Sequence, residues 1–142
     1  MSVAVPVLPP HPAVGQSSER RARGSAASAA LGRRGEALAA QYLESQGLVV
    51  LSRNWRCREG ELDLVATDGV RLVVCEVKTR SSDWQGDPAQ AVDRAKLRRL
   101  RRLAGRWLTT FRVGWCEIRF DVIAVHWPPS GPIRLRHRRG VS

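Results

Sequence analysis

The sequence predicts an α/β fold in which a mixed β-sheet is flanked by helices, and three observations carry this prediction. A stretch rich in alanine and leucine, with helical spacing, is followed by three β-type segments. A second helical stretch, rich in arginine, then precedes a last β-type segment. At 142 residues the chain has room for one domain with a modest core.

The first helix is expected from about residue 28 to residue 46, since apolar residues recur there near helical spacing and Gly47 is a favourable stop. A β-branched segment, residues 48–53, predicts the first strand. A basic connector at residues 54–59 leads to a hairpin over residues 61–78, which supplies two further strands.

A polar loop at residues 81–88 precedes the second helix, which is expected from about residue 88 to residue 108. Its apolar face comprises Val92, Leu100, Leu103, Ala104 and Trp107. The last strand is expected at residues 117–126. Helix, three strands, helix and strand is the order of a mixed sheet with helices on it.

The two ends of the chain differ from its middle in composition. Residues 1–27 are rich in Pro, Ala, Ser and Arg without periodicity, and residues 128–142 are rich in Pro and Arg. Both are predicted to be disordered tails. Residues 28–127 are therefore expected to form a single domain.

The predicted hairpin carries charged residues inside apolar strands. Glu61 and Asp63 lie in its first strand, and Glu76 and Lys78 in its second. Residues two apart on a strand point to the same face, so Glu76 and Lys78 emerge together. Carboxylates in apolar surroundings are costly unless they bind something, and oxygen ligands suit Mg²⁺ or Mn²⁺. A solvated hairpin face with an ordinary Glu76–Lys78 surface pair is the alternative.

The pairing of this hairpin depends on its turn. A two-residue turn at Asp68 and Gly69 would place Thr67 opposite Val70, Glu61 opposite Glu76, and Asp63 opposite Val74. The four charged residues would then share one face, and the other would hold Leu62, Leu64, Val73, Cys75 and Val77. A bulge or a longer loop would change this pairing.

The net charge of +11 is unevenly distributed. Eight basic residues and no acids lie from Arg94 to Arg112: Arg94, Lys96, Arg98, Arg99, Arg101, Arg102, Arg106 and Arg112. This density predicts contact with a phosphate backbone. A solvated helix, or arginine enriched by codon bias, is the alternative. Trp55 and Trp84 flank the hairpin and could stack on bases or plug the edge of the core.

Three widely spaced cysteines fit neither a disulfide framework nor a zinc site, and they suit a reducing compartment. No apolar stretch approaches the length of a membrane span, and prolines interrupt the N-terminal segment where a secretory signal would be apolar. The expected location is the cytoplasm, with no membrane partner.

Several motifs follow one another between residues 31 and 125. They are GRRGE at 32–36, RNWRC at 53–57, GELDLV at 60–65, EVKTR at 76–80, GDP at 86–88 with Ala91 and Val92, Lys96, and RFDV at 119–122. In this order they resemble the YraN family, small bacterial proteins with a restriction-endonuclease-like fold similar to archaeal Holliday junction resolvases. Gln90 and Cys75 depart from the residues commoner in that family.

The resemblance implies a metal-dependent nuclease acting on DNA, with branched or structured DNA as the substrate. It implies Asp63, Glu76, Lys78 and Glu36 as catalytic residues. Asp63, Glu76, Glu36 and the carbonyl of Val77 would hold Mg²⁺ or Mn²⁺. Glu61 is not required by the superfamily pattern, and a homodimer is compatible with the resolvase likeness.

Two other classes of function stay open. The first is a nucleic-acid-binding accessory protein on a nuclease fold that no longer cuts. The second is an interaction protein that uses its basic segments to bind an acidic partner. Metal-dependent turnover separates the nuclease from the first, and a preference for nucleic acid over other polyanions separates both from the second.

Overall fold

The computed structural model describes residues 2–5, 20–82 and 86–142. Its strands are β1 (Ser2–Val5), β2 (Val49–Cys57), β3 (Gly60–Thr67), β4 (Leu72–Arg80), β5 (Ile118–His126) and β6 (Ile133–Arg138). Its helices are α1 (Arg20–Ser45), the 3₁₀ helix η2 (Pro88–Ala91) and α2 (Arg94–Thr110). The predicted α/β class is confirmed.

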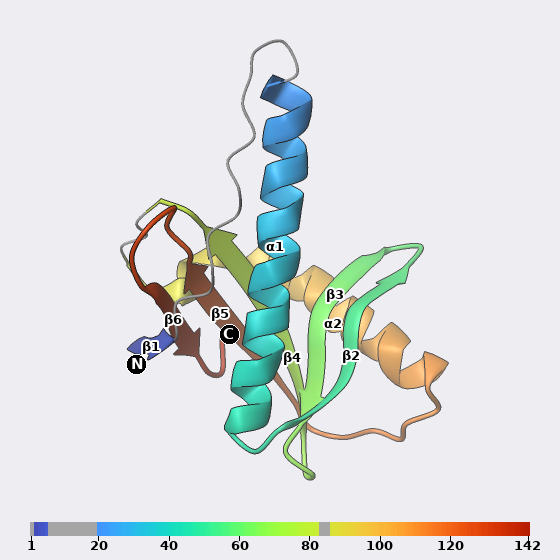
Figure 1. Ribbon diagram of the computed structural model, residues 1–142. Coiled ribbons are helices and arrows are strands. Elements are labelled where there is room, and N and C mark those ends of the chain that lie inside the picture. Colours follow the sequence, from blue (N-terminus) through green and yellow to red (C-terminus); the bar gives the residue numbers. More distant parts are fainter. Residues whose placement is uncertain (1, 6–19, 83–85) are drawn as a thin grey trace.

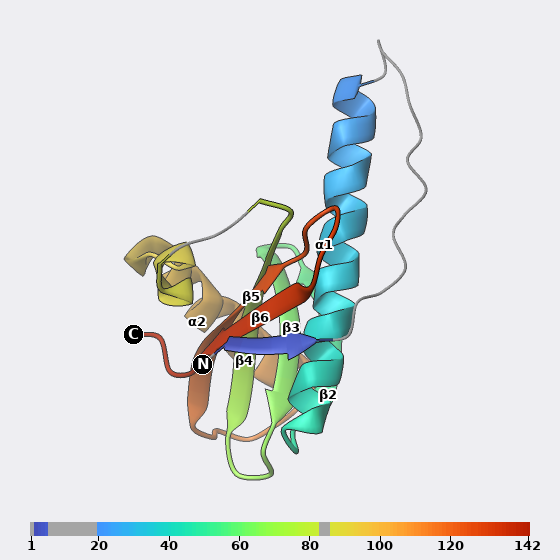
Figure 2. The same ribbon diagram turned by 60° about the vertical axis from the view of Figure 1, so that its left-hand side comes forward.

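The strands form one sheet in the order β1-β6-β5-β4-β3-β2. β4 and β5 are parallel, and the other neighbours are antiparallel. α1 crosses one face of this mixed sheet and α2 lies on the other (Figure 1). The view turned by 60° shows the sheet between the two helices (Figure 2). The connection from β4 to β5 therefore passes through α2, as a parallel pair requires.

Buried side chains fill a layer on each face of the sheet. The layer under α1 includes Ala39, Leu43, Leu64, Val73, Cys75 and Ile123. The layer under α2 includes Leu62, Val65, Val74, Leu97, Leu100, Leu103 and Trp107. Successive residues of β4 alternate between the two layers, so this strand is buried on both faces. Val92, Leu100, Leu103, Ala104 and Trp107 are buried, as the sequence predicted.

The ends of the chain hold more regular structure than expected. α1 begins at Arg20, and Ser2–Val5 pairs with β6, while residues 6–19 lie outside the described part. Ile133–Arg138 was expected to be mobile but forms β6 beside β5. Ile133 and Leu135 are buried while Arg134 between them is exposed. The strand was not predicted because only two apolar residues alternate with arginines, and the basic composition of the segment suggested disorder.

The second helix begins later than predicted. Pro88–Ala91 forms η2, Val92 is extended, and α2 starts only after Asp93. The Oδ1 atom of Asp93 accepts a hydrogen bond from the backbone N–H of Lys96 at 2.7 Å. An aspartate cap of this kind fixes where a helix starts.

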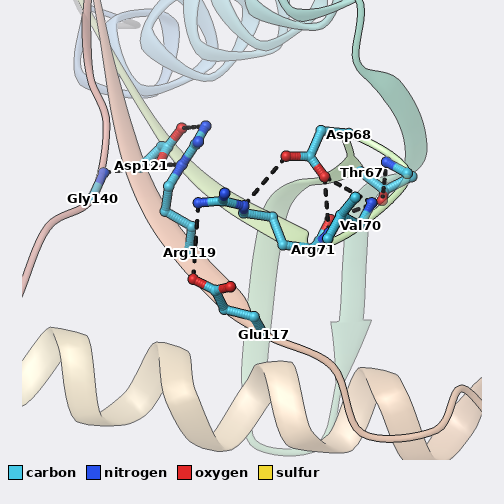
Figure 3. Close-up of polar contacts among 9 residues, drawn as sticks. Thr67, Asp68, Val70, Arg71, Glu117, Arg119, Asp121 and Gly140 are labelled. Atoms are coloured by element: carbon cyan, nitrogen blue, oxygen red, sulfur yellow. Dashed lines mark hydrogen bonds and ion pairs between the residues drawn. The ribbon is translucent and has the colours of Figure 1, made fainter.

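The hairpin turn has four residues, so the predicted two-residue turn was wrong. Thr67 lies opposite Leu72, not Val70. The Oδ1 atom of Asp68 accepts hydrogen bonds from the N–H groups of Val70, at 2.9 Å, and Arg71, at 2.8 Å (Figure 3). These bonds hold the longer turn in place of a tight one. The register moves by two residues, which leaves the predicted faces of β4 unchanged.

One part of the predicted face assignment was wrong. Leu62 packs in the layer under α2, whereas Leu64 packs under α1. Residues two apart on a regular strand would share a face, so β3 rotates at Asp63. On the neighbouring strand β2, Trp55 pairs with Leu62 and Arg53 pairs with Leu64, so Asn54 lies next to Asp63. Asn54 also has an unusual backbone conformation, with a φ of 50°. Asp63 therefore lies where the hairpin changes faces.

Candidate active site

Asp63 is held against β4 by a backbone hydrogen bond. Its Oδ2 atom accepts from the N–H of Val77 at 2.9 Å, which brings the carboxylate beside Glu76. Burial, and then the negative charges of Glu76 and Glu36, raise the pKa of Asp63 to about 8, although the Val77 bond opposes this shift. The chain therefore places two carboxyl groups together in a partly dry environment.

Glu76 is the more buried member of the pair, at 6% exposure. Its Oε1 atom lies 2.7 Å from the ammonium nitrogen of Lys96, whose side chain reaches it from the first turn of α2. A buried carboxylate is tolerated when a cation pairs with it. Lys96 was predicted to contact nucleic acid, but the structure brings it into the candidate active site.

Glu36 approaches the same place from α1. Its Oε2 atom is buried and lacks a hydrogen-bond partner in the described structure. Burial, followed by the negative charges of Glu61 and Glu76, raises the pKa of Glu36, while a hydrogen bond with Asn54 opposes the shift. An unsatisfied buried oxygen in a native protein calls for an explanation, such as an ion that the oxygen would bind.

The position of Glu36 depends on the glycine before it. A Cβ atom added at Gly35 would lie 1.8 Å from the Oγ1 atom of Thr79 in β4, so only glycine permits this contact. α1 can thus approach β4 closely, which sets Glu36 above the strand that carries Glu76. In the motif that contains both residues, Gly35 therefore allows the close packing that positions the carboxylate of Glu36.

The remaining predicted site residues have distinct positions. Lys78 follows Glu76 on the same face of β4 and is half-buried. Val77 contributes the N–H that holds Asp63, and the metal-ligand role of its carbonyl stays a prediction. Glu61 forms an exposed ion pair with Arg56 at 3.3 Å, a kind of contact that contributes little stability.

The fit of these residues to a metal ion can be tested on their chemistry. Among the described residues, no group of three or more His, Cys, Asp or Glu side chains forms a ready-made metal site. Mg²⁺ commonly binds through only one or two carboxylates and keeps several waters. Asp63 and Glu76 meet that requirement, and Glu36, with its unsatisfied oxygen, adds a third carboxyl group close enough to raise the pKa of Asp63.

The other predicted nucleic-acid-binding residues lie on the outer surface of α2. Six arginines are exposed there: Arg94, Arg98, Arg99, Arg101, Arg102 and Arg106. Arg106 also pairs with Glu59 at 2.8 Å. Trp55 packs against the core layer under α2, which supports its interpretation as a plug, and Trp84 lies outside the described residues.

Sequence reasoning missed a second buried carboxylate cluster, centred on Asp121 of β5. Both oxygens of Asp121 accept from the guanidinium of Arg119 at 2.9 Å, and the N–H of Gly140 donates to Oδ1 at 3.1 Å (Figure 3). His137 Nε2 lies 2.8 Å from Oδ2, and His137 Nδ1 lies 3.1 Å from the Tyr42 hydroxyl. The sequence offered one signal for this cluster: Arg119 lies two residues before Asp121, so the two side chains share one face of the predicted strand and can pair.

Burial alone would raise the pKa of Asp121, but the hydrogen bonds from His137, Arg119 and Gly140 outweigh it and hold that pKa below its usual value. This cluster joins β5, β6 and α1. It therefore holds the C-terminal segment on the fold.

No helix in the described part of the chain is long and apolar enough to cross a membrane. The fold is a single α/β domain with a mixed sheet between two helices, and its candidate site gathers carboxylates from three elements. Comparisons with known proteins identify the family of the chain. A family model described as uncharacterised protein family UPF0102 matches residues 35–125.

Relatives in that family cover most of the chain. A UPF0102 protein of Frankia alni is 54% identical over 111 residues, which are 78% of this chain and 92% of the relative. One from Beutenbergia cavernae is 54% identical over 113 residues, 80% of this chain and 96% of the relative. One from Mycolicibacterium vanbaalenii is 48% identical over 119 residues, 84% and 98% of the two chains. The chain belongs to the UPF0102 family, which is the YraN family of the motif resemblance.

Proposed function

We propose that this protein is a metal-dependent nuclease that hydrolyses phosphodiester bonds in branched or structured DNA. One observation carries the proposal: Glu36, Asp63 and Glu76 come from three separate elements, and their proximity raises the pKa values of Asp63 and Glu36. Perturbed carboxyl groups of this kind cluster at functional sites. The exposed arginines of α2, the helix that also carries Lys96, support a phosphate-bearing substrate.

The residues have separate roles in this mechanism. Asp63, Glu76 and Glu36 would hold Mg²⁺ or Mn²⁺, which supplies neutralisation of phosphate charge and a lower pKa for a bound water. Lys78 orients the attacking water or stabilises the charge on the phosphate. The water oxygen forms a bond to phosphorus while the bond from phosphorus to the 3′ oxygen breaks. The 3′ oxygen leaves as a hydroxyl group, with a proton from the water. The arginines of α2 hold the backbone and set affinity rather than sequence preference.

A specific observation favours a second candidate function. The ammonium of Lys96 lies 2.7 Å from Glu76, so the charge of this one carboxylate is compensated without a metal ion. A nucleic-acid-binding accessory protein that does not cut would need no more than this. We also propose that the protein is located in the cytoplasm and forms a homodimer. The free thiols of Cys57, Cys75 and Cys116 suit a reducing compartment.

Cleavage assays separate the two functions. Labelled single-stranded, duplex, flap and four-way-junction DNA would be incubated with Mg²⁺ or Mn²⁺ and the wild-type protein, Asp63→Asn or Glu76→Gln. Glu44→Gln, an exposed carboxylate of α1, is the matched control. Metal-dependent cutting by the wild type and the control, lost in both site variants, supports the nuclease. Binding without cutting on every substrate supports the accessory protein.

A further inference from the structure

The turn after α2 carries exposed apolar side chains that neither the core nor the candidate active site uses. Trp115 is 91% exposed, Phe111 50% and Val113 42%. Single exposed apolar residues are common, but an apolar patch on a surface of otherwise charged residues marks an interaction site. The segment leaves α2 at the end opposite Lys96 and returns to β5 (Figure 1).

Arg112 in the same turn has an unusual backbone conformation. Its φ is 54°, in the left-handed region. Its N–H donates to the carbonyl of Thr109 at 3.2 Å, and the N–H of Val113 donates to the carbonyl of Leu108 at 2.9 Å. These two bonds define a Schellman helix end, where glycine is usual because a side chain is strained. The chain keeps an arginine there, and strain of this kind concentrates at functional sites.

The chain segment that carries the patch is basic. No acidic residue occurs from Arg94 to Cys116. Glu117, which follows, lies 3.8 Å from the guanidinium of Arg71. The ring of Phe111 packs on Trp107, with centroids 4.8 Å apart, so it is anchored while half of it stays exposed. The turn therefore combines two accessible aromatic rings with an exposed arginine.

We propose that Phe111, Arg112 and Trp115 form a stacking platform for the unpaired bases of a single-stranded nucleic-acid segment. Aromatic rings stack on any base, and arginine adds attraction to bases and phosphates. The proposal rests on the nucleic-acid partner of the proposed function and narrows it to substrates with an unpaired region. The platform lies about 22 Å from Lys96 along α2, at about 1.5 Å per residue.

Binding without metal tests this platform separately from cleavage. The full chain would be titrated, in EDTA, into fluorescein-labelled single strands of thymidine or uridine nucleotides and into a blunt duplex of the same length. Trp115→Ala is expected to weaken binding to the single strands by about tenfold, with duplex binding unchanged. Trp115→Phe, which keeps a ring, is expected to retain most of the affinity. Val70→Ala removes an exposed apolar side chain elsewhere and should change nothing.

Arg112→Gly gives a second readout that a structural role would not produce. Glycine relieves the left-handed strain, so the Tm should rise by about 3 °C while single-strand affinity falls. Equal losses for single strands and duplex, or no loss in Trp115→Ala, would overturn the proposal. So would a change from dimer to monomer in Trp115→Ala, because the patch would then be a self-association surface. Ring-dependent binding by a protein that never cuts would leave this platform standing and reject the nuclease.

Discussion

Two buried carboxylate clusters lie on the same sheet and differ in how their charges are satisfied. Asp121 is 1% exposed, and Arg119, His137 and Gly140 surround both of its oxygens, which holds its pKa down. Asp63 has the N–H of Val77 but faces other carboxylates, and its pKa is raised to about 8. Burial is common to both sites, so the difference lies in their partners.

The comparison separates a structural carboxylate from a candidate functional one. A satisfied buried ion pair fixes the positions of the elements that it joins. A group of buried carboxylates with one unsatisfied oxygen is unfavourable by itself, and a bound cation would relieve the repulsion.

The largest effect is expected on catalysis. Glu76→Gln and Asp63→Asn should each reduce metal-dependent cleavage on the order of 1000-fold, because the neutral amide binds a divalent cation poorly. Affinity for DNA should stay unchanged or rise, since a negative charge near the phosphates is lost. Single-turnover rates and equilibrium binding measure the two effects, and cleavage at the wild-type rate by both variants would show that the site is misassigned.

Asp121→Asn should lower the free energy of unfolding by about 3 kcal/mol, because it removes the buried carboxylate that binds the half-buried guanidinium of Arg119 through both oxygens. Asp63→Asn should not destabilise the protein in the same assay at neutral pH, because a pKa of about 8 keeps Asp63 largely protonated in the folded state and asparagine is also neutral. Urea unfolding followed by circular dichroism provides both values. Equal destabilisation by the two variants would remove the distinction between the clusters.

Gly35→Ala should separate α1 from β4, since the added methyl group would overlap Thr79. We expect a loss of about 2 kcal/mol in stability, together with weaker cleavage from a displaced Glu36. Gly32→Ala is the matched control, because a Cβ atom at Gly32 meets nothing within 4 Å. Similar behaviour of the two variants would contradict the positioning role of Gly35.

The pH dependence of stability should distinguish the clusters by sign. The raised pKa of Asp63 means that the folded state binds its proton more tightly than the unfolded state. Its contribution is fully present below about pH 4 and is lost as the pH rises towards 8. Asp121, with a lowered pKa, acts in the opposite direction and loses its contribution as the pH falls. Asp63→Asn should remove the loss between pH 5 and 8, and unfolding curves across that range would detect it.

The smallest effect concerns the arginines of α2. Neutralising Arg98, Arg99, Arg101 and Arg102 should flatten the dependence of log affinity on log salt by about 0.9 for each lost phosphate contact with duplex DNA. The exposed arginines of β6, Arg134 and Arg138, offer a control of like charge on another strand. An unchanged slope in the α2 variant would exclude this helix as the contact surface.

The sequence predicted which carboxylates belong to the cluster, but it did not predict the geometry of the hairpin that carries two of them. Periodicity and charge indicated the two helices, the acidic hairpin and the apolar face of α2. The four-residue turn was missed because the side chain of Asp68, not its backbone preference, holds the turn. The opposite faces of Leu62 and Leu64 were missed because a local rotation at Asp63 breaks the period of two.

Long-range contacts were the other limit. Lys96 was grouped with the other basic residues of the second helix as a contact for nucleic acid. Its pairing with Glu76 becomes visible only when α2 is packed on the sheet. His137 was given no role, since its partners Tyr42 and Asp121 are 95 and 16 residues away in the sequence. A pattern within one segment cannot identify such contacts.

Divalent-cation binding tests the comparison most directly. Free Mn²⁺ would be measured by electron paramagnetic resonance during titration of the wild type, Asp63→Asn, Asp121→Asn and the Glu44→Gln control. We predict one bound ion in the wild type and the control, none in Asp63→Asn, and retained binding in Asp121→Asn under conditions where it is folded. Binding by Asp63→Asn equal to that of the wild type, or no binding by the wild type, would contradict the assignment of the unsatisfied cluster as a metal site.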